Sequence, residues 1–416
     1  MTYQGASQRP GIFYGWWVVA AAFAITFVGF GSAYTFSAFL EQLQNEFGAS
    51  RGSVSLVFSL AGFLYFGLGI VSGPLADRFG SRAFALAGMV LVGLGLALAS
   101  VAQTLIQVYL AYGLGVGLGV GCAYVPAIGA VQRWFVRRRG FASGLAVAGI
   151  GVGTLVMPPL ASYLIAIVGW RGAYLSLGII ALLLGGGMAL LVANDPASRG
   201  LNPDGDDRTA QSQAVRASGA SVIDAIRASR FINLYVAGLI CSFGVFIPFV
   251  HLVPFARDQG LSGWLAALLL SMIGIGSTAG RFFLGSLADN MGRERSLLLM
   301  FVGMAAALAI WAVSTSLWPL IVFAFVYGVF YGGWVAVLPA VVMDYFGGRN
   351  VSGIIGVLYT SVAFGTLIGP SLAGYIFDLS HSYELPIAAS AGTNIIAALI
   401  VAFAPKSAPA NAEASG

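Results

Sequence analysis

The sequence predicts an all-α membrane protein in which about twelve transmembrane helices form two similar halves. Three observations support this prediction: the composition is very apolar, apolar runs of membrane-spanning length follow one another, and the two halves of the chain repeat. Of the 416 residues, 59% are hydrophobic and 8% are charged, whereas about 25% of the residues of an ordinary soluble domain are charged. A chain with this composition cannot cover itself with a water-facing surface, so lipid must be its main solvent.

Apolar runs define the expected helices and domains. A helix needs about 20 apolar residues to cross the hydrocarbon core of a bilayer. The runs of about this length are 13–40, 52–75, 83–101, 104–131, 141–167, 172–193, 231–257, 264–287, 296–315, 318–343, 351–377 and 386–404. One long hydrophilic stretch separates them into two sets of six. We therefore expect a six-helix bundle over 13–193, a linker over 194–230 and a second six-helix bundle over 231–404, flanked by polar tails at 1–12 and 405–416.

The distribution of basic residues predicts the orientation of the helices. If the N-terminus lies in the cytoplasm, the segments on that side carry sixteen of the 20 Lys and Arg residues, and the opposite loops carry only Arg51, Arg171 and Arg257. Cytoplasmic loops of membrane proteins are enriched in Lys and Arg, so both termini, including the two tails, and the linker are expected in the cytoplasm. We expect a monomeric multi-pass protein of the cell inner membrane.

Charge and cysteine content argue against other classes of protein. The formal net charge is +5, but the arginines are scattered between apolar runs. Basic loops beside membrane helices explain this pattern better than a nucleic-acid-binding face. Cys122 and Cys241 lie inside apolar runs, and the sequence has no CxxC motif or Cys/His cluster. The sequence therefore predicts no metal and no other cofactor, and it lacks the buried nucleophile–base pair of an enzyme.

The two halves of the chain repeat at an offset of 212 residues. Gly-Pro-Leu-Ala-Asp-Arg-Phe-Gly at 73–80 matches Gly-Ser-Leu-Ala-Asp-Asn-Met-Gly at 285–292, and Gly-Thr-Leu at 153–155 recurs at 365–367. A parallel repeat of this kind predicts two bundles related by an axis along the membrane normal. The substrate of such a protein is expected between the bundles.

The repeated motif resembles the loop signature of the major facilitator superfamily, and the resemblance covers nearly the whole chain. It implies the major facilitator fold, with two pseudo-symmetric six-helix bundles. The glycines of the motif allow close helix approach, and its acidic residue can cap or pair at helix ends to hold one access state. We assign this gating role to Asp77, Arg78, Asp289 and Arg293, although the same charges could simply be solvated loop groups.

Three segments resemble the monocarboxylate transporter family and its bacterial relatives, which include oxalate/formate-type carriers. They are Tyr-Gly-Trp-Trp-Val-Val at 14–19, Arg-Trp-Phe at 133–135 followed by Arg-Gly-Phe-Ala-Ser-Gly at 139–144, and Gly276 followed by Arg281 and 285–289. The resemblance implies a secondary active transporter of a small monocarboxylate, coupled to protons and working by alternating access. In this family, the arginine at the position of Arg281 binds the carboxylate.

Arg281 is the one cation in the interior of a predicted span rather than at its end, and a charged side chain there costs about 3 kcal/mol. All fifteen acidic residues can be placed in loops, tails or the last turn of a helix, so none is expected to pair with it. The guanidinium could bond to backbone carbonyls or reach the inner membrane face. We favour a third possibility, in which its planar fork binds an anionic substrate.

Charge balance narrows the expected substrate. One fixed cation neutralises one carboxylate, whereas a dianion such as oxalate would favour two. Oxalate-type relatives place a lysine in helix 11, and the matching position in this sequence is Tyr359. The sequence therefore predicts a monocarboxylate such as lactate, pyruvate or acetate.

Further polar candidates are four tyrosines in spans that line the cavity in this superfamily: Tyr34, Tyr124, Tyr331 and Tyr359. Each could donate a phenolic hydrogen bond to the substrate, or could be an ordinary packing residue. Asn394, in the peripheral last span, is expected to be structural.

Proton coupling has one candidate inside a span. His251 has the only side chain there that ordinarily titrates near neutral pH, so we assign it as proton carrier and substrate contact, with a structural role as the alternative. Animal relatives pair the helix 8 arginine with an aspartate and use a lysine in helix 1, and the matching residues of this sequence are Ser277 and Tyr34. Their proton-handling pair is therefore missing, and the substrate itself could bring the proton.

Proton-coupled monocarboxylate symport is the leading prediction. The alternatives are an exchanger of formate, oxalate or a related anion, and a multidrug or sugar facilitator of the same fold. The expected partners are a small organic anion, protons and membrane lipid, with no nucleic acid.

Overall fold

The computed structural model describes residues 13–205, 219–347 and 350–403, and the predicted tails 1–12 and 405–416 lie outside these residues. In the described part of the chain the structure is helical, with no β-strand. The first half contains α1 (Gly15–Tyr34), α2 (Phe36–Phe47), α3 (Arg51–Gly67), α4 (Gly69–Phe79), α5 (Ser81–Ser100), α6 (Leu105–Val108), α7 (Gly115–Trp134), α8 (Arg139–Ile180) and α9 (Gly187–Ala189). The second contains α10 (Val222–Arg227), α11 (Ser229–Val245), α12 (Ile247–Asp258), α13 (Gly263–Met291), α14 (Arg293–Ala312), α15 (Leu317–Phe346), α16 (Val351–Ser380) and α17 (Glu384–Ala402).

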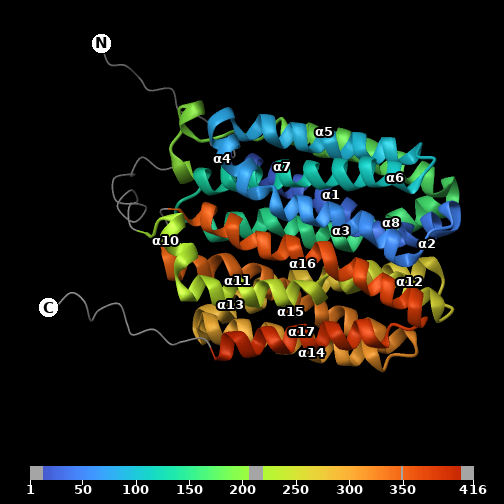
Figure 1. Ribbon diagram of the computed structural model, residues 1–416. Helices are drawn as coiled ribbons and strands as arrows, with labels where there is room; N and C mark the ends of the chain where they lie inside the picture. Colours follow the sequence, from blue (N-terminus) through green and yellow to red (C-terminus); the bar gives the residue numbers. More distant parts are fainter. Residues whose placement is uncertain (1–12, 206–218, 348–349, 404–416) are drawn as a thin grey trace, which may run out of the picture.

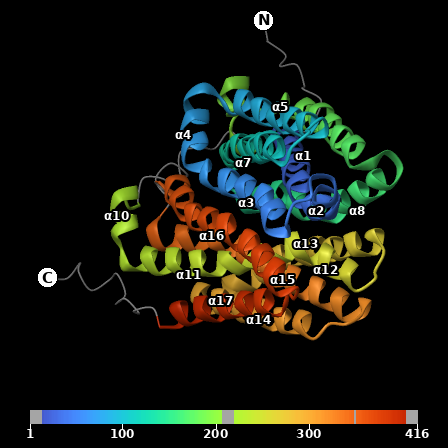
Figure 2. The same cartoon turned by 45° about the vertical axis from the view of Figure 1, so that its right-hand side comes forward.

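The helices form two bundles that lie side by side (Figures 1 and 2). Elements α1–α9 make the first bundle and α11–α17 the second. α1 begins and α17 ends at the same end of the molecule, close to α10, and we call this the linker end. The opposite end, where α2 and α12 lie, is the distal end.

The described helices account for the predicted spans. Ten helices are long and apolar enough to cross a membrane, and the bent pair α3–α4 makes an eleventh span. The longest of the ten, Gly140–Ala189, has 50 residues and is interrupted at Gly169, where φ is +69°. Arg171 bonds to Glu46 at the distal end and Leu191 accepts a bond from Tyr14 at the linker end, so the chain turns back at Gly169. This helix therefore holds two spans, which brings the total to the predicted twelve.

The two halves match position by position. α5 and α14 are each 20 residues long and start 212 positions apart. The same offset relates three pairs of residues with positive φ at helix ends: Gly48 and Gly260, Gly80 and Gly292, and Gly169 and His381. Glycine adopts positive φ without strain, so it can end a helix sharply. The prediction of two pseudo-symmetric bundles is confirmed.

Glycines bring α13 into direct contact with two neighbours. A Cβ atom at Gly280 would overlap the backbone of Val329 on α15, and one at Gly328 would overlap the backbone of Ile273. Toward the other bundle, a Cβ at Gly274 would lie 2.6 Å from the backbone nitrogen of Leu155 on α8. α13 therefore packs closely against α15 of its own bundle and α8 of the other, and this places Arg281 at the junction of the two bundles.

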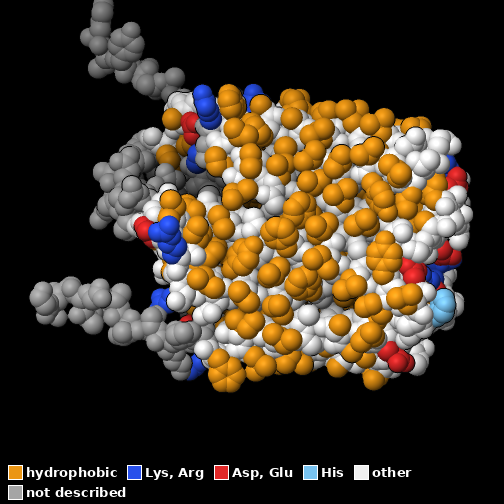
Figure 3. Space-filling model, in the orientation of Figure 1, with side chains coloured by type: hydrophobic (Ala, Val, Ile, Leu, Met, Phe, Trp, Pro, Cys, Tyr) orange, Lys and Arg blue, Asp and Glu red, His pale blue; other side chains and the backbone are white. Residues whose placement is uncertain are grey.

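The surface agrees with a lipid environment. Figure 3 shows apolar side chains over the flank of the molecule and charged side chains gathered at its two ends. Large apolar side chains such as Leu183, Phe283 and Leu379 are 74%, 74% and 88% exposed. A soluble monomer rarely exposes apolar surface over so wide an area. The chain is a multi-pass membrane protein.

Candidate functional site

Arg281 lies at the centre of the molecule without a protein partner. Its three guanidinium nitrogens are all buried, and none has a hydrogen-bond partner among the described residues. One nitrogen approaches Gly151 on α8, where an added Cβ would lie 3.3 Å from it. An uncompensated buried charge is expensive because it has lost its hydration. A carboxylate or a water molecule that binds the guanidinium compensates this loss. The sequence predicts that no acidic residue pairs with Arg281, and none of the described acidic residues bonds to it.

Arg281 lines a small cavity of about 30 Å³ between the bundles. A volume of this size holds about one water molecule, so the loaded state must be wider. Four tyrosines share the cavity wall with Arg281: Tyr34, Tyr124, Tyr331 and Tyr359. The structure therefore brings together five of the six residues predicted to bind substrate.

The hydroxyl groups of Tyr34 and Tyr331 lie 3.2 Å apart, so they join α1 of one bundle to α15 of the other. Only one of the two hydroxyl protons can be used in this contact, which leaves the other free to bind an anion. This pair is a polar contact between the bundles in the wall of the Arg281 cavity.

Broken helices shape the same region. α1 ends at Tyr34 and α2 begins at Phe36, while α11 ends at Val245 and α12 begins at Ile247, followed by a proline. Proline has no backbone N–H, so carbonyls near the second break lose their helical donor. The proline is Pro248, which leaves the Gly244 carbonyl without its helical donor, and the Ser390 hydroxyl donates to that carbonyl at 2.9 Å. The Tyr327 hydroxyl donates to the neighbouring Val245 carbonyl at 2.7 Å. Discontinuous helices that meet at the middle of the membrane are typical of transporter substrate sites.

Eight residues of the cavity wall were not predicted; four are aliphatic and four are aromatic, and the aromatic ones are Phe30, Phe66, Phe246 and Trp334. Two had a signal in the sequence. Phe246 occupies the position 212 residues after Tyr34, and Trp334 lies one helical turn after Tyr331 on α15. Among the described residues that line the cavity, none is acidic, histidine, serine, threonine or an amide. Arg281 is therefore the one charged group in an otherwise aromatic and aliphatic wall.

His251 is placed outside this cavity. It is buried on α12, where its Nε2 lies 2.8 Å from the Pro370 carbonyl and its Nδ1 lies 3.1 Å from the Tyr383 hydroxyl. A carbonyl oxygen only accepts, so in the neutral ring Nε2 donates to Pro370 and Nδ1 accepts from Tyr383. Both ring nitrogens are thus used in contacts between helices. The roles predicted for His251 in proton transfer and substrate binding remain untested.

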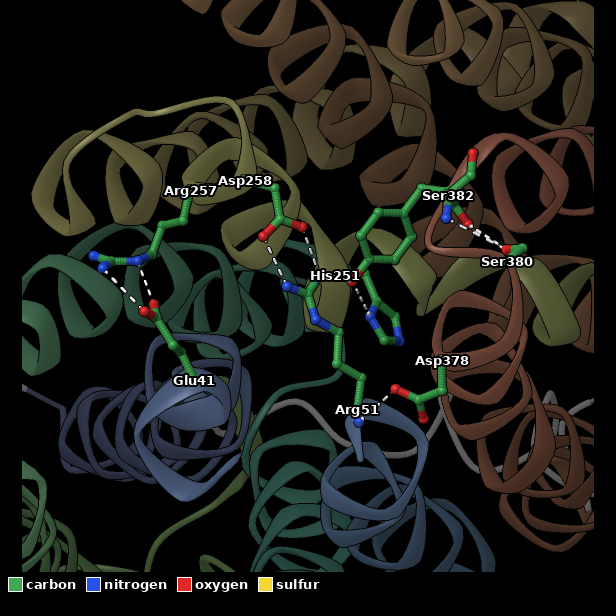
Figure 4. A network of polar contacts seen from close by, with 9 residues as sticks. Glu41, Arg51, His251, Arg257, Asp258, Asp378, Ser380 and Ser382 are labelled. Atoms are coloured by element: carbon green, nitrogen blue, oxygen red, sulfur yellow. Dashed lines mark hydrogen bonds and ion pairs between the residues drawn. The ribbon is translucent and has the colours of Figure 1, made fainter. Parts of the chain in front are cut away.

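A polar network joins the bundles at the distal end (Figure 4). The Arg51 guanidinium binds both carboxylate oxygens of Asp258 at 2.7 Å and donates to the Tyr383 hydroxyl at 2.9 Å. The backbone N–H groups of Arg51 and Gly52 each donate to Asp378 at 2.9 Å. A carboxylate at a helix N-terminus is stabilised by the free N–H groups and by the helix dipole. We call these residues the distal network.

A second cross-bundle pair lies nearby. Arg257 of α12 forms an ion pair with Glu41 of α2. Both side chains border a pocket of about 540 Å³ at the distal end, together with Tyr163, Ala166 and residues 263–264. This pocket is separate from the Arg281 cavity.

The four predicted gating residues lie at the linker end. The side chains of Asp77 and Asp289 lie outside the described part of the chain. Arg78 is exposed, with its guanidinium carbon 5.3 Å from the centre of the Phe79 ring. Arg293 forms an ion pair with Asp344 of α15 at 2.7 Å, within the second bundle. The predicted gating role stays a prediction for all four.

Comparisons with known proteins decide the family. The model of the Major Facilitator Superfamily matches residues 21–313 and 265–416. Human monocarboxylate transporter 11 is 30% identical over 419 residues, which cover 98% of this chain and 86% of the relative. Rat monocarboxylate transporter 3 is 32% identical over 394 residues, which cover 92% of this chain and 78% of the relative.

The chain belongs to the major facilitator superfamily and, within it, to the monocarboxylate transporter family. Human monocarboxylate transporter 2 is similar to a comparable degree, at 30% identity over 410 residues that cover 93% of this chain and 84% of the relative. These relatives are transporters, so the predictions of a transporter rather than an enzyme, and of this family, are confirmed. The family suggests a small organic anion as the substrate class.

A crystal structure shows the same fold. It is that of a bacterial homologue of the human lysosomal transporter Spinster, in an inward-facing and unoccupied conformation. The TM-score is 0.72 at 16% sequence identity, and the match covers 95% of this chain and 97% of the other. The predicted major facilitator fold is therefore confirmed.

Proposed function

We propose that this protein is a secondary active transporter of a small monocarboxylate, with Arg281 as the residue that binds the carboxylate. The observation that carries the proposal is the unpartnered Arg281 guanidinium at the junction of the bundles. A planar guanidinium matches a carboxylate through two parallel hydrogen bonds, and charge assistance makes these bonds strong.

Charge balance supports a monoanion. The cavity wall holds one cation and no anion, so one carboxylate makes the loaded cavity electrically neutral. To switch between its two access states, the protein must enclose the site away from water. Enclosing a neutral site is easier than enclosing a charged one, because desolvation of a net charge is costly. This argument favours lactate, pyruvate or acetate over a dicarboxylate.

We further propose that uptake is coupled to protons and proceeds by alternating access. Because the cavity wall contains no acidic or histidine side chain, the transported proton must be carried by another group or by the substrate. Reorientation requires the Tyr34–Tyr331 contact and the distal network to open in turn, since both join the two bundles.

The orientation belongs to the same proposal. The excess of Lys and Arg at the linker end supports a cytoplasmic linker and cytoplasmic termini in the cell inner membrane. The distal network then faces the outside, and it holds the bundles together on that side.

Uptake by proteoliposomes tests the proposal. We expect saturable uptake of radiolabelled lactate, pyruvate or acetate that rises with an inward proton gradient. Arg281→Ala and Arg281→Lys should lower uptake by about 100-fold or more, because a bidentate charge-assisted contact is lost. Arg227→Ala, an exposed arginine on α10, is the matched control and should leave uptake unchanged. Unchanged uptake in the Arg281 variants would refute the binding role, and uptake that ignores the proton gradient would refute symport.

A further inference from the structure

The pocket of about 540 Å³ at the distal end lies between the two bundles. Its wall combines α2 and the first part of α8 from one bundle with α12 and the start of α13 from the other. The volume is within the range of ligand pockets, roughly 300–1,000 Å³. The described walls of this pocket and of the Arg281 cavity share no residue, so the pocket can hold a ligand other than the transported substrate.

The first turn of α13 presents hydrogen-bond donors to this pocket. Gly263 and Trp264 begin the helix and line the pocket, and their backbone N–H groups have no partner among the described residues. The residues 212 positions earlier, Arg51 and Gly52, have the equivalent N–H groups, and both donate to Asp378. Free N–H groups at a helix N-terminus favour an anion. Of two equivalent helix ends, one therefore has a carboxylate and the other has a pocket.

Arg257 places a guanidinium at the same helix end. Its ion pair with Glu41 uses Nε and Nη2. The third nitrogen, Nη1, lies beside the start of α13, where an added Cβ at Gly263 would be 2.7 Å from it. Guanidinium groups and helix N-terminal N–H groups both bind phosphate and carboxylate oxygens. Nη1 and the first N–H groups of α13 thus form one anion-binding surface.

α2 adds further polar groups to the wall. Ser37 lines the pocket and is 2% exposed, and its hydroxyl has no hydrogen-bond partner in the described part of the chain. Glu41 and Gln42 line the same pocket, and their side-chain oxygens accept hydrogen bonds. A simple anion would meet the Glu41 carboxylate, whereas a ligand with a negative and a positive group matches both kinds of wall residue.

Two aromatic side chains place the pocket at the level of the lipid headgroups. Tyr163 and Trp264 line the pocket, and both are about half exposed. Tyr and Trp are concentrated where a membrane meets water. Figure 3 shows the apolar flank of the molecule giving way to charged side chains at this end. Lipid headgroups therefore surround the protein at the depth of this pocket.

We propose that this pocket binds the phosphoethanolamine headgroup of a zwitterionic phospholipid. Arg257 and the first N–H groups of α13 bind the phosphate, while Glu41 and Gln42 accept hydrogen bonds from the ammonium. A phosphocholine headgroup has no N–H donors for these acceptors, and a phosphoglycerol headgroup has no positive charge for Glu41. Glu41 and Arg257 belong to different bundles, so the bound headgroup links the bundles and favours the state in which the distal end is closed.

Lipid titration of the purified protein in a mild detergent tests this inference, with the melting temperature as the measurement. We expect dioleoyl phosphatidylethanolamine to raise the melting temperature saturably, by about 4 °C. Phosphatidylcholine and phosphatidylglycerol with the same chains should need about tenfold higher concentrations, because each lacks one set of contacts. Soluble O-phosphoethanolamine tests for a free solute, and an equal effect at the concentration of the lipid would overturn the assignment to membrane lipid.

A charge exchange separates the lipid site from the ion pair itself. The double variant Glu41→Arg, Arg257→Glu keeps an ion pair between the bundles but places the carboxylate beside the start of α13. We expect it to lose the preference for phosphatidylethanolamine, since the phosphate would meet a negative charge there. An unchanged preference would mean that the pair only joins the bundles, and the inference would be wrong.

A second variant fills the site from within the chain. Ala166 lines the pocket and lies 212 positions before Asp378, so Ala166→Asp supplies the carboxylate that α13 lacks. We expect a higher melting temperature without lipid and a smaller rise with phosphatidylethanolamine, because the new carboxylate takes the N–H groups that bind phosphate. A rise as large as that of the native protein would contradict phosphate binding at this helix end.

Arg171→Gln is the matched control. It removes the ion pair with Glu46, whose side chains are exposed to the same degree as those of Arg257 and Glu41. Neither residue of this pair lines the pocket, so the variant should keep the lipid preference of the native protein. An equal response of the native protein to all three lipids, or no response, would overturn the inference and leave the role proposed for Arg281 unaffected.

Discussion

The two bundles meet along two symmetry-related helix pairs, α3 with α16 and α13 with α8, and the two pairs differ at the distal end. In the first pair, Asp378 of α16 accepts hydrogen bonds from the first backbone N–H groups of α3. In the second pair, the residue 212 positions before Asp378 is Ala166, which borders the pocket of about 540 Å³ beside Gly263, the first residue of α13. One side of the interface is closed by a carboxylate cap, and the other is hollow.

The middle of the same helices differs as well. α13 is continuous from Gly263 to Met291, whereas α3 and α4 meet at a bend of 42°. The residue 212 positions before Arg281 is Gly69, the first residue of α4, and an added Cβ there would lie 3.0 Å from the Val125 side chain. The duplicated fold therefore sets where the helices begin and end. The two halves differ in single features: the second half has the buried charge of Arg281, and the first has the bend between α3 and α4.

The largest effect on stability is expected at Gly280 of α13. The residue 212 positions earlier, in the other half, is Leu68, so Gly280→Leu makes α13 resemble its counterpart. In Gly280→Leu the new Cβ would overlap the Val329 backbone, and helices packed this closely cannot move apart without losing contacts along their length. We expect no folded protein, or a loss of more than about 3 kcal/mol of stability. Thermal unfolding of the purified protein measures this, and Gly285→Ala, where the nearest atom is 3.8 Å from the new Cβ, should behave like the native protein.

A second change removes the charge that distinguishes the halves. Arg281→Met keeps an unbranched side chain about as long as the aliphatic part of arginine and abolishes a buried cation that costs about 3 kcal/mol. We expect carboxylate transport to disappear while the melting temperature rises by several degrees, because the orphaned guanidinium no longer has to be buried. A melting temperature below that of the native protein would mean that Arg281 stabilises the fold through contacts within the chain.

A smaller effect is expected at the distal network. Asp378→Asn leaves one acceptor for two backbone N–H groups and removes the charge at the helix N-terminus, a loss of about 1 kcal/mol. The bundles should part more readily at the distal end. A cysteine in place of Ser59, which bonds to Ser371 across the same interface at 2.9 Å, should then react about fivefold faster with a thiol reagent, in a background without Cys122 and Cys241.

Glu384→Gln provides the control for that measurement, because Glu384 is an exposed carboxylate at the same end of the molecule. Its substitution should leave the labelling rate unchanged. Equal acceleration in both variants would show that general charge at the distal end matters and that the cap on α3 does not.

Much of the site could be predicted because its signals are local. Arg281 stands out as a charge in an apolar run, and the four tyrosines were chosen because they lie in spans that line the cavity in the resembling superfamily. Trp334 carries only a weak signal, its position one helical turn after Tyr331, since a tryptophan in a membrane span is otherwise ordinary packing. Whether His251 lies beside Arg281 is also invisible in the sequence, because that depends on how α12 sits against α16.

The sequence by itself determined that the chain lives in a membrane, that its halves repeat, and that one guanidinium has no anion of its own. These properties follow from composition and spacing, which need no knowledge of contacts between distant residues. Only the tertiary structure decided that four phenols and an indole share a cavity with Arg281, and that Asp378 caps a helix of the other bundle. Such contacts join residues hundreds of positions apart, and they arise from close packing of whole helices rather than from any local preference.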